Sequence, residues 1–155
     1  MKNLVLVLFS FLIGHAVVAQ DSSVPGMEKI MEQRAREMFR IISLDSPDEW
    51  KNFIRENYTK ALIDKPMQAK VEGGGSTTSS APKTLEGNIE GKAGMYRMLH
   101  GDFGGGQIKT IKTTGEKLDM TVSNEGMNGV FTLRFSKEKP YLIDGLGIEV
   151  GDGNR

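Results

Sequence analysis

Apolar residues recur at steps of three and four in the first half of the chain, which is the spacing of an amphipathic helix. The longest such stretch covers residues 25–42, and Ser22 or Ser23 lies where a helix cap is expected. Its apolar stripe consists of Met27, Ile30, Met31, Ala35, Met38, Phe39 and Ile42. We therefore predict a helix over residues 25–42, with one side in the core and a charged side in solvent.

A second helix is predicted to begin at Pro47. Ser46 can cap it, and Glu49, three residues later, completes a capping-box pattern. Pro47 suits the first helical position because it needs no backbone N–H there. Trp50, Phe53 and Ile54 then form its apolar stripe, and a short further turn over residues 61–63 is predicted to stop near Pro66.

Residues 72–84 are rich in Gly, Ser and Thr, and this composition predicts a flexible loop within one domain. The sequence leaves open whether this loop has a function or is an insertion that the fold tolerates. Leu85, Ile89, Tyr96 and Leu99 indicate one third helix, which the glycines of residues 101–106 are predicted to end.

From Gln107 onward the apolar period changes to two, which is typical of strands. The predicted strands lie near residues 108–113, 118–122, 131–135 and 142–150. Gly115-Glu116 and Asn128-Gly129 are the predicted turns. Strands joined by short turns are antiparallel neighbours, so we predict an α+β domain with N-terminal helices packed on an antiparallel meander sheet.

Composition restricts the location and the chemistry. Residues 1–19 combine Lys2, an apolar run and small residues before a cleavage site after Ala19, as in a bacterial secretory signal peptide. The alternative is an uncleaved anchor. We predict one exported domain over residues 20–155, periplasmic or extracellular, with no stable membrane insertion after cleavage.

The chain has no Cys, and its 20 Lys and Arg balance 20 Asp and Glu. The absence of Cys excludes disulfides, thiolate metal sites and a cysteine nucleophile. The balanced charge offers no broad electrostatic case for binding nucleic acid. No residue pattern calls for a cofactor or a metal.

Two segments carry a family resemblance. Residues 45–58, from Asp45 to Tyr58, resemble the second helix of secreted bacterial nuclear-transport-factor-2-like (cystatin-like cone) domains. Residues 131–135 and 139–150 resemble the last two strands of that family. These domains occur alone or in front of β-lactamase-type serine hydrolases and processing-type peptidases. The resemblance implies a curved sheet wrapped around a helix, with a pocket, and it implies no single function because the fold serves enzymes, binding proteins and dimerisation modules alike.

Enzymes of that architecture use Asp, His or Tyr in the pocket, so Asp144 and the pair Tyr96 and His100 are the candidate acid–base groups. Tyr96 and His100 are four residues apart and share one helix face. The alternative places Asp144 in solvent at a strand bend and His100 at a helix end, where a cation is favoured.

The apolar residues allow two interpretations, because the same side chains can line a pocket or fill a core. They are Trp50, Phe53, Ile54, Tyr96, Phe131, Leu133 and Ile143. We predict a non-enzymatic module that binds a small apolar ligand or a partner protein, or that forms a homodimer through an apolar open sheet face. The alternative is a small isomerase- or dehydratase-like enzyme using Asp144 or Tyr96 and His100.

Overall fold

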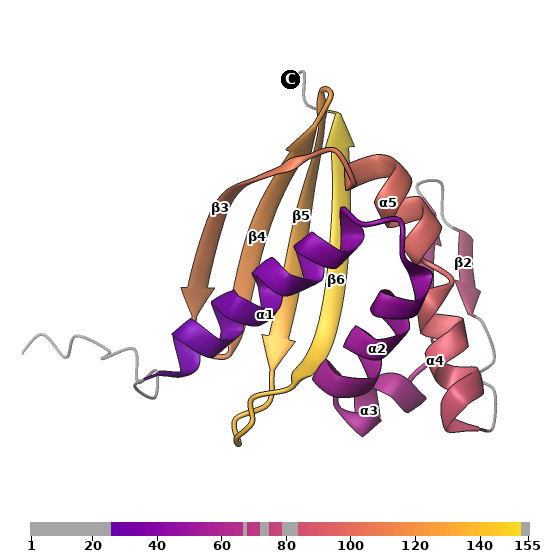
Figure 1. The fold of residues 1–155 in the computed structure, drawn as a ribbon, viewed down its shortest axis with the longest axis vertical. Helices are drawn as coiled ribbons and strands as arrows, with labels where there is room; N and C mark the ends of the chain where they lie inside the picture. Colours follow the sequence, from indigo (N-terminus) through magenta and orange to yellow (C-terminus); the bar gives the residue numbers. More distant parts are fainter. Residues whose placement is uncertain (1–25, 67, 72–74, 79–83, 153–155) are drawn as a thin grey trace, which may run out of the picture.

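The computed structural model of the protein describes residues 26–66, 68–71, 75–78 and 84–152. The predicted signal peptide and the predicted caps Ser22 and Ser23 lie outside these residues. Figure 1 shows one antiparallel sheet with α1 lying across one of its faces, and with the remaining helices gathered beyond the strand β6. This arrangement confirms the α+β fold with helices packed against an open antiparallel sheet.

The helices are α1 (Met27–Ile42), α2 (Pro47–Asn57), α3 (Lys60–Asp64), α4 (Leu85–Ala93) and α5 (Tyr96–Phe103). The strands are β1 (Gln68–Val71), β2 (Gly75–Thr78), β3 (Gln107–Thr114), β4 (Lys117–Asn124), β5 (Met127–Phe135) and β6 (Ile143–Asp152). The strands β3 to β6 form a four-stranded sheet in the order of the sequence, so the predicted meander is confirmed.

The core lies between α1 and the sheet. Every expected member of the α1 stripe except Ile30 is buried, and Ile30 packs against the core from its margin. From the sheet, alternate side chains of β4 and β5 point toward α1 and are at most 2% exposed: Leu118, Met120, Val122, Phe131, Leu133 and Phe135. The period of two therefore correctly predicted which face of the sheet is buried.

The predicted turn at Asn128-Gly129 is wrong. The chain reverses at Glu125 and Gly126, whose φ angles of 44° and 87° are those of a tight hairpin turn. Asn128 and Gly129 lie inside β5. Gly129 is needed there because the ring of Phe103 occupies the space of a side chain: a Cβ atom would lie 2.5 Å from Phe103 Cζ.

The prediction of a single third helix is also wrong, because the structure has two helices, α4 and α5, in its place. The break falls at Gly94 and Met95, the residues that cap the two helices. The predicted end of the helix within the glycines of residues 101–106 is confirmed, since α5 ends at the fully buried Phe103 and Gly104 caps it. Burial of Phe103 against the sheet offsets the low helix propensity of one glycine.

The predicted capping box is not formed. Pro47 does begin α2, but the side chain of Ser46 makes no capping hydrogen bond, and its backbone N–H donates to the hydroxyl of Tyr96 at 2.8 Å. Two threonines cap other helices instead. The Oγ1 of Thr59 accepts from Leu62 N–H at the start of α3, and that of Thr84 accepts at the start of α4.

The predicted loop over residues 72–84 is wrong in part. Gly75–Thr78 forms β2, which pairs antiparallel with β1. A two-stranded ladder is held by backbone hydrogen bonds, which the Gly, Ser and Thr of this segment can make as well as any other residues. Residues 72–74 and 79–83 lie outside the described residues.

Candidate functional site

The pair Tyr96 and His100 is brought together on α5, as the spacing predicts. Their rings stack with centroids 5.7 Å apart and an interplanar angle of 14°. The hydroxyl of Tyr96 accepts from Ser46 N–H at 2.8 Å, and Nδ1 of His100 lies 2.8 Å from the carbonyl oxygen of Ile42. Since a carbonyl only accepts, Nδ1 carries a proton. Both polar ends thus hold the connection between α1 and α2.

Asp144 lies at the start of β6, on the surface. Its carboxylate accepts a hydrogen bond from Thr59 Oγ1 at 3.1 Å and lies 3.9 Å from Arg134 Nε. The side chain is 41% exposed. The Asp144 carboxylate is therefore surrounded by a threonine, an arginine and solvent, and it does not lie in the apolar pocket expected of an acid–base group.

The residues predicted as pocket or core lie in the core. They are at most 3% exposed: Trp50, Phe53, Ile54, Tyr96, Phe131, Leu133 and Ile143. Trp50 stacks on Phe53 at 5.7 Å and contacts Tyr96 at 6.2 Å. These side chains fill the space between the helices and the sheet, where the family resemblance implies a pocket.

A hollow lies on the surface of the protein, between the end of α2, the short α3 and the start of α4. These helices belong to the group beyond β6 (Figure 1). We call it the α2–α3–α4 groove. It has a volume of about 660 Å³ and is open to solvent, a size in the range of small-molecule sites. Its lining residues are Arg55, Tyr58, Lys60, Ile63, Asp64, Leu85 and Asn88.

The lining of this groove is amphipathic. Tyr58 and Ile63 are buried side chains of its wall, and Leu85 is 51% exposed, an unusual exposure for leucine. Burial raises the pKa of the Tyr58 hydroxyl, so the phenol stays neutral at physiological pH. Leu85 therefore supplies most of the exposed apolar surface that a ligand could cover, and Tyr58 and Ile63 lie beneath it in the wall.

Charged groups stand beside that apolar surface. Lys60 pairs with Asp64 one helical turn away, and Asn88 Nδ2 donates to Asp64 Oδ1 at 2.9 Å. The hydrogen bond from Lys60 holds the pKa of Asp64 below its usual value, with a further contribution from Asn88. Arg55 reaches Glu86 of α4 at 3.0 Å. The two cations are thus held by neighbouring acids at exposed positions.

Sequence reasoning did not find this groove. Its walls come from two parts of the chain, Arg55 to Asp64 and Leu85 to Asn88, which only the tertiary structure brings together. The one available signal was Leu85, an apolar residue directly after a polar segment and a helix cap.

A smaller hollow of about 340 Å³ lies between the start of α2 and the junction of α4 with α5. The ion pair between Lys51 and Glu90, at 2.6 Å, lies in its lining. The hydrogen bond from Lys51 to Glu90 raises the pKa of the Lys51 ammonium group. Tyr96, a predicted site residue, also lines this hollow, together with charged and small residues. The hollow offers less apolar surface than the α2–α3–α4 groove.

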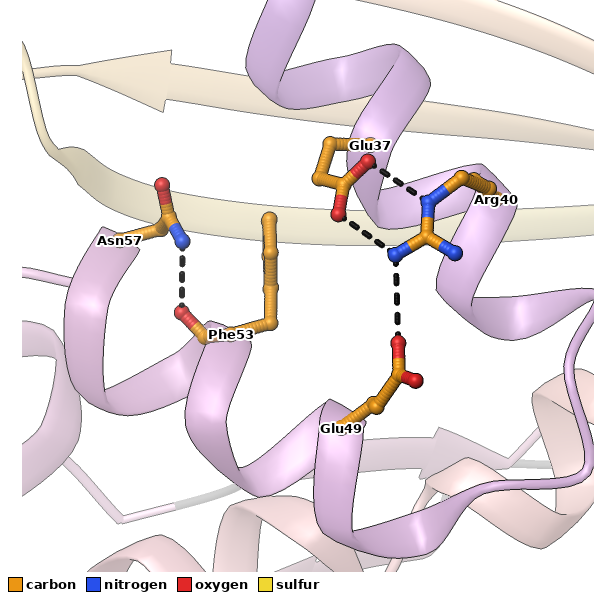
Figure 2. Close-up of polar contacts among 5 residues, drawn as sticks. All are labelled: Glu37, Arg40, Glu49, Phe53 and Asn57. Atoms are coloured by element: carbon orange, nitrogen blue, oxygen red, sulfur yellow. Dashed lines mark hydrogen bonds and ion pairs between the residues drawn. The ribbon is translucent and has the colours of Figure 1, made fainter.

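Polar contacts at the surface join α1 to α2 (Figure 2). Arg40 donates to both carboxylate oxygens of Glu37 at 2.8 Å and to Glu49 of α2 at 3.2 Å. Farther along α2, the Asn57 side chain donates to the carbonyl of Phe53 at 3.0 Å. The Arg40 contacts lie in solvent, where ion pairs contribute little to stability, and they mark the junction of two helices.

The sheet face turned away from α1 is polar. Its side chains include Lys112, Asp119, Thr121, Thr132, Arg134 and Glu149. The hydroxyl of Thr132 on β5 donates to the carboxylate of Asp119 on β4 at 2.7 Å, so side chains of neighbouring strands hydrogen-bond to each other on this face. A face-to-face homodimer through an apolar open sheet is therefore not supported by the chemistry of this surface.

No family model matches the chain, and no curated protein matches it. Within residues 26–66, 68–71, 75–78 and 84–152, no three His, Asp or Glu side chains gather closely enough to hold a metal ion. The helices of this described part include none with the length and apolar character needed to span a membrane.

Proposed function

We propose that the protein is a non-enzymatic binding module that takes a small amphipathic carboxylate in the α2–α3–α4 groove. One observation carries the proposal: the interior is filled, while the groove outside combines exposed Leu85 with the cations Arg55 and Lys60. A ligand would lay its apolar part on Leu85, Tyr58 and Ile63. Its carboxylate would face the two cations and would share them with their present partners, Glu86 and Asp64.

The enzyme alternative has less support. Acid–base catalysis needs a titratable group within hydrogen-bond reach of a bound substrate. Tyr96 and His100 point their polar atoms at backbone groups of the α1–α2 connection, and Asp144 lies beside Thr59 and Arg134. None of the three residues lines the α2–α3–α4 groove, and Tyr96 lines the smaller hollow with its hydroxyl bound to Ser46 N–H.

We further propose that the domain is a nuclear-transport-factor-2-like domain exported to the periplasm or the medium. Support for the family comes from the residues of α2 and of the last two strands, and from the order of helices before a meander sheet. Support for export comes from the sequence of residues 1–19 alone.

Binding of octanoate, compared with octanol, tests the proposed ligand class by isothermal titration calorimetry. Octanoate has both the apolar chain and the carboxylate, whereas octanol lacks the charge. We expect octanoate to bind more tightly than octanol by about tenfold, the effect of one charge-assisted contact in a partly exposed site. Equal binding of the two, or no binding of either, would count against the proposal.

Two matched variants locate the site. Leu85 and Met98 are exposed to nearly the same extent, 51% and 53%, but only Leu85 lines the groove. Leu85→Glu is expected to abolish octanoate binding, because it replaces the apolar surface with a like charge. Met98→Glu makes the same kind of change on α5 and should leave binding unchanged. Equal loss in both variants would place the ligand elsewhere.

A further inference from the structure

Two polar atoms in the lining of the α2–α3–α4 groove lack the hydrogen bonds that buried polar atoms normally make. The hydroxyl of Tyr58 bonds to none of the described residues, although this side chain is only 5% exposed. The Oδ1 atom of Asn88 is buried and has no partner in the described part of the chain either. Such atoms are nearly always paired, and an acceptor without a donor is costly. Both residues line the groove, so a ligand bound there could pair with both atoms.

Tyr58 offers a hydrogen-bond donor within the apolar part of the groove. It caps the end of α2, and its ring packs edge-on against Phe53 with the ring centroids 6.2 Å apart. Burial alone raises the pKa of its hydroxyl, with no contribution from a charged or hydrogen-bonding neighbour. The hydroxyl therefore keeps its proton and can donate it to an oxygen atom of a ligand.

Asn88 offers an acceptor whose position is fixed by Asp64. The Nδ2 atom of Asn88 donates to Asp64 Oδ1 at 2.9 Å, which leaves Oδ1 of Asn88 as the atom that needs a donor. The other oxygen of the Asp64 carboxylate binds the ammonium group of Lys60. One carboxylate thus holds the amide of Asn88 and the cation of Lys60 side by side in the lining of the groove.

We propose that the carboxylate ligand of this groove is an N-acyl amino acid, and that Tyr58 and Asn88 recognise its amide group. This inference rests on the proposed function and narrows its ligand class. A secondary amide carries one acceptor and one donor, which are what the two unpaired atoms require. The hydroxyl of Tyr58 donates to the ligand carbonyl, and the ligand N–H donates to Asn88 Oδ1.

The order of groups along such a ligand matches the order of the lining residues. The acyl chain lies on Leu85, and the amide reaches Asn88, which follows three residues later on α4. The ligand carboxylate then faces Lys60. In an α-amino acid a single carbon separates the N–H group from the carboxylate, and in the groove a single carboxylate, that of Asp64, separates Asn88 from Lys60. A plain fatty acid has no amide to pair with either unpaired atom.

Access to Asn88 requires a shift of side chains in the groove lining. Its Oδ1 atom is covered in the free protein. Two other lining side chains, Lys60 and Leu85, are 83% and 51% exposed and can change rotamer with little loss of packing. Rotamer changes of this kind are common on binding, so the proposal requires side-chain movement alone.

Three ligands with the same acyl chain test the proposal by isothermal titration calorimetry: N-octanoylglycine, its ester analogue octanoyloxyacetate, and octanoate. The ester keeps the carbonyl but has an oxygen atom in place of the N–H group, so it cannot donate to Asn88. We expect N-octanoylglycine to bind about tenfold more tightly than either of the other two. Equal binding of the amide and the ester would leave water as the partner of Asn88 Oδ1 and overturn the proposal.

Two buried tyrosines supply matched variants. Tyr58 and Tyr141 are 5% and 3% exposed, but Tyr141 does not line the groove. Tyr58→Phe should weaken the binding of N-octanoylglycine about fivefold and leave that of octanoate unchanged, because only the amide ligand uses the hydroxyl. Tyr141→Phe should change neither affinity. Equal losses in the two variants would contradict the assignment of the hydroxyl.

Asn88→Ala tests the acceptor through a ratio of affinities, which a modest loss of stability leaves unaffected. N-octanoylglycine and its ester should bind this variant alike, and circular dichroism checks that it is folded. A preference for the amide that persists in Asn88→Ala overturns the role of Asn88. If octanoate binds the wild type and N-octanoylglycine binds no more tightly, this inference is wrong and the proposed function stands. If none of the three ligands binds, the proposed function fails as well.

Discussion

Gly129→Ala tests whether the interior is filled where α5 meets the sheet. The new Cβ atom would lie 2.5 Å from Phe103 Cζ and 2.8 Å from Phe103 Cε1. Because ordinary contact begins near 3.4 Å, the Phe103 ring must retreat by about 1 Å. The ring is fully buried and meets Phe131 edge-on at 5.3 Å, so it has little space in which to retreat.

The size of the effect follows from two opposing contributions. Forcing an extra carbon atom into a packed core costs about 1–3 kcal/mol. Replacing a strand glycine with alanine gains about 0.5–1 kcal/mol through the lower entropy of the unfolded chain. The middle of the overpacking range exceeds the middle of the entropy range, so we expect Gly129→Ala to lower the free energy of unfolding by about 1 kcal/mol.

Urea denaturation measures this change as a shift of the midpoint at constant m value. Gly151→Ala is the matched control, because a Cβ atom there meets nothing within 4 Å and the variant should be as stable as wild type or slightly more so. A Phe103→Leu background should remove most of the Gly129→Ala penalty. If Gly129→Ala is neutral, or if its cost is the same in both backgrounds, the interior at this place has unfilled space and the reasoning is refuted.

Two further predictions concern hydrogen bonds that hold the fold. Tyr96→Phe removes the acceptor of Ser46 N–H, and it should lower the free energy of unfolding by about 1 kcal/mol in urea denaturation; no change would contradict a structural role for this hydroxyl. The hydrogen bond from Lys117, then that from Thr132, holds the pKa of Asp119 below 3.8. When folding lowers the pKa of a carboxyl group, the ionised group stabilises the fold at any pH above its pKa in the unfolded chain. This stabilisation is lost as the pH falls through the pKa in the folded protein. Wild type should therefore be more stable than Asp119→Asn at neutral pH, and the difference should shrink in acid; a constant difference would contradict this.

The sequence predicted the elements whose signal is local. The period of the α1 stripe and the alternation of Leu118, Met120 and Val122 gave both the elements and their buried sides correctly. The turn at Asn128-Gly129 was mispredicted because Asn-Gly is a strong hairpin signal. The actual reason for Gly129 is its contact with Phe103, which comes from another element and cannot be read from neighbouring residues.

The candidate site was less predictable for a related reason. Phe131 and Leu133 suit a pocket wall and a core equally, because both require apolar side chains on one face of a strand. Only packing distinguishes the two cases. The α2–α3–α4 groove arises where Ile63 and Leu85, far apart in the sequence, come to line one hollow. No periodic pattern in a single segment could indicate that.

The most direct test of the central claim is a methyl NMR titration of the protein with octanoate. The claim is that the ligand site lies in the α2–α3–α4 groove and that the interior is filled. It predicts that the methyl signals of Ile63 and Leu85 shift on titration, while those of the buried Leu133 and Ile143 stay in place. Shifts at Leu133 and Ile143, without shifts at Ile63 and Leu85, would place the ligand between the helices and the sheet and contradict the account.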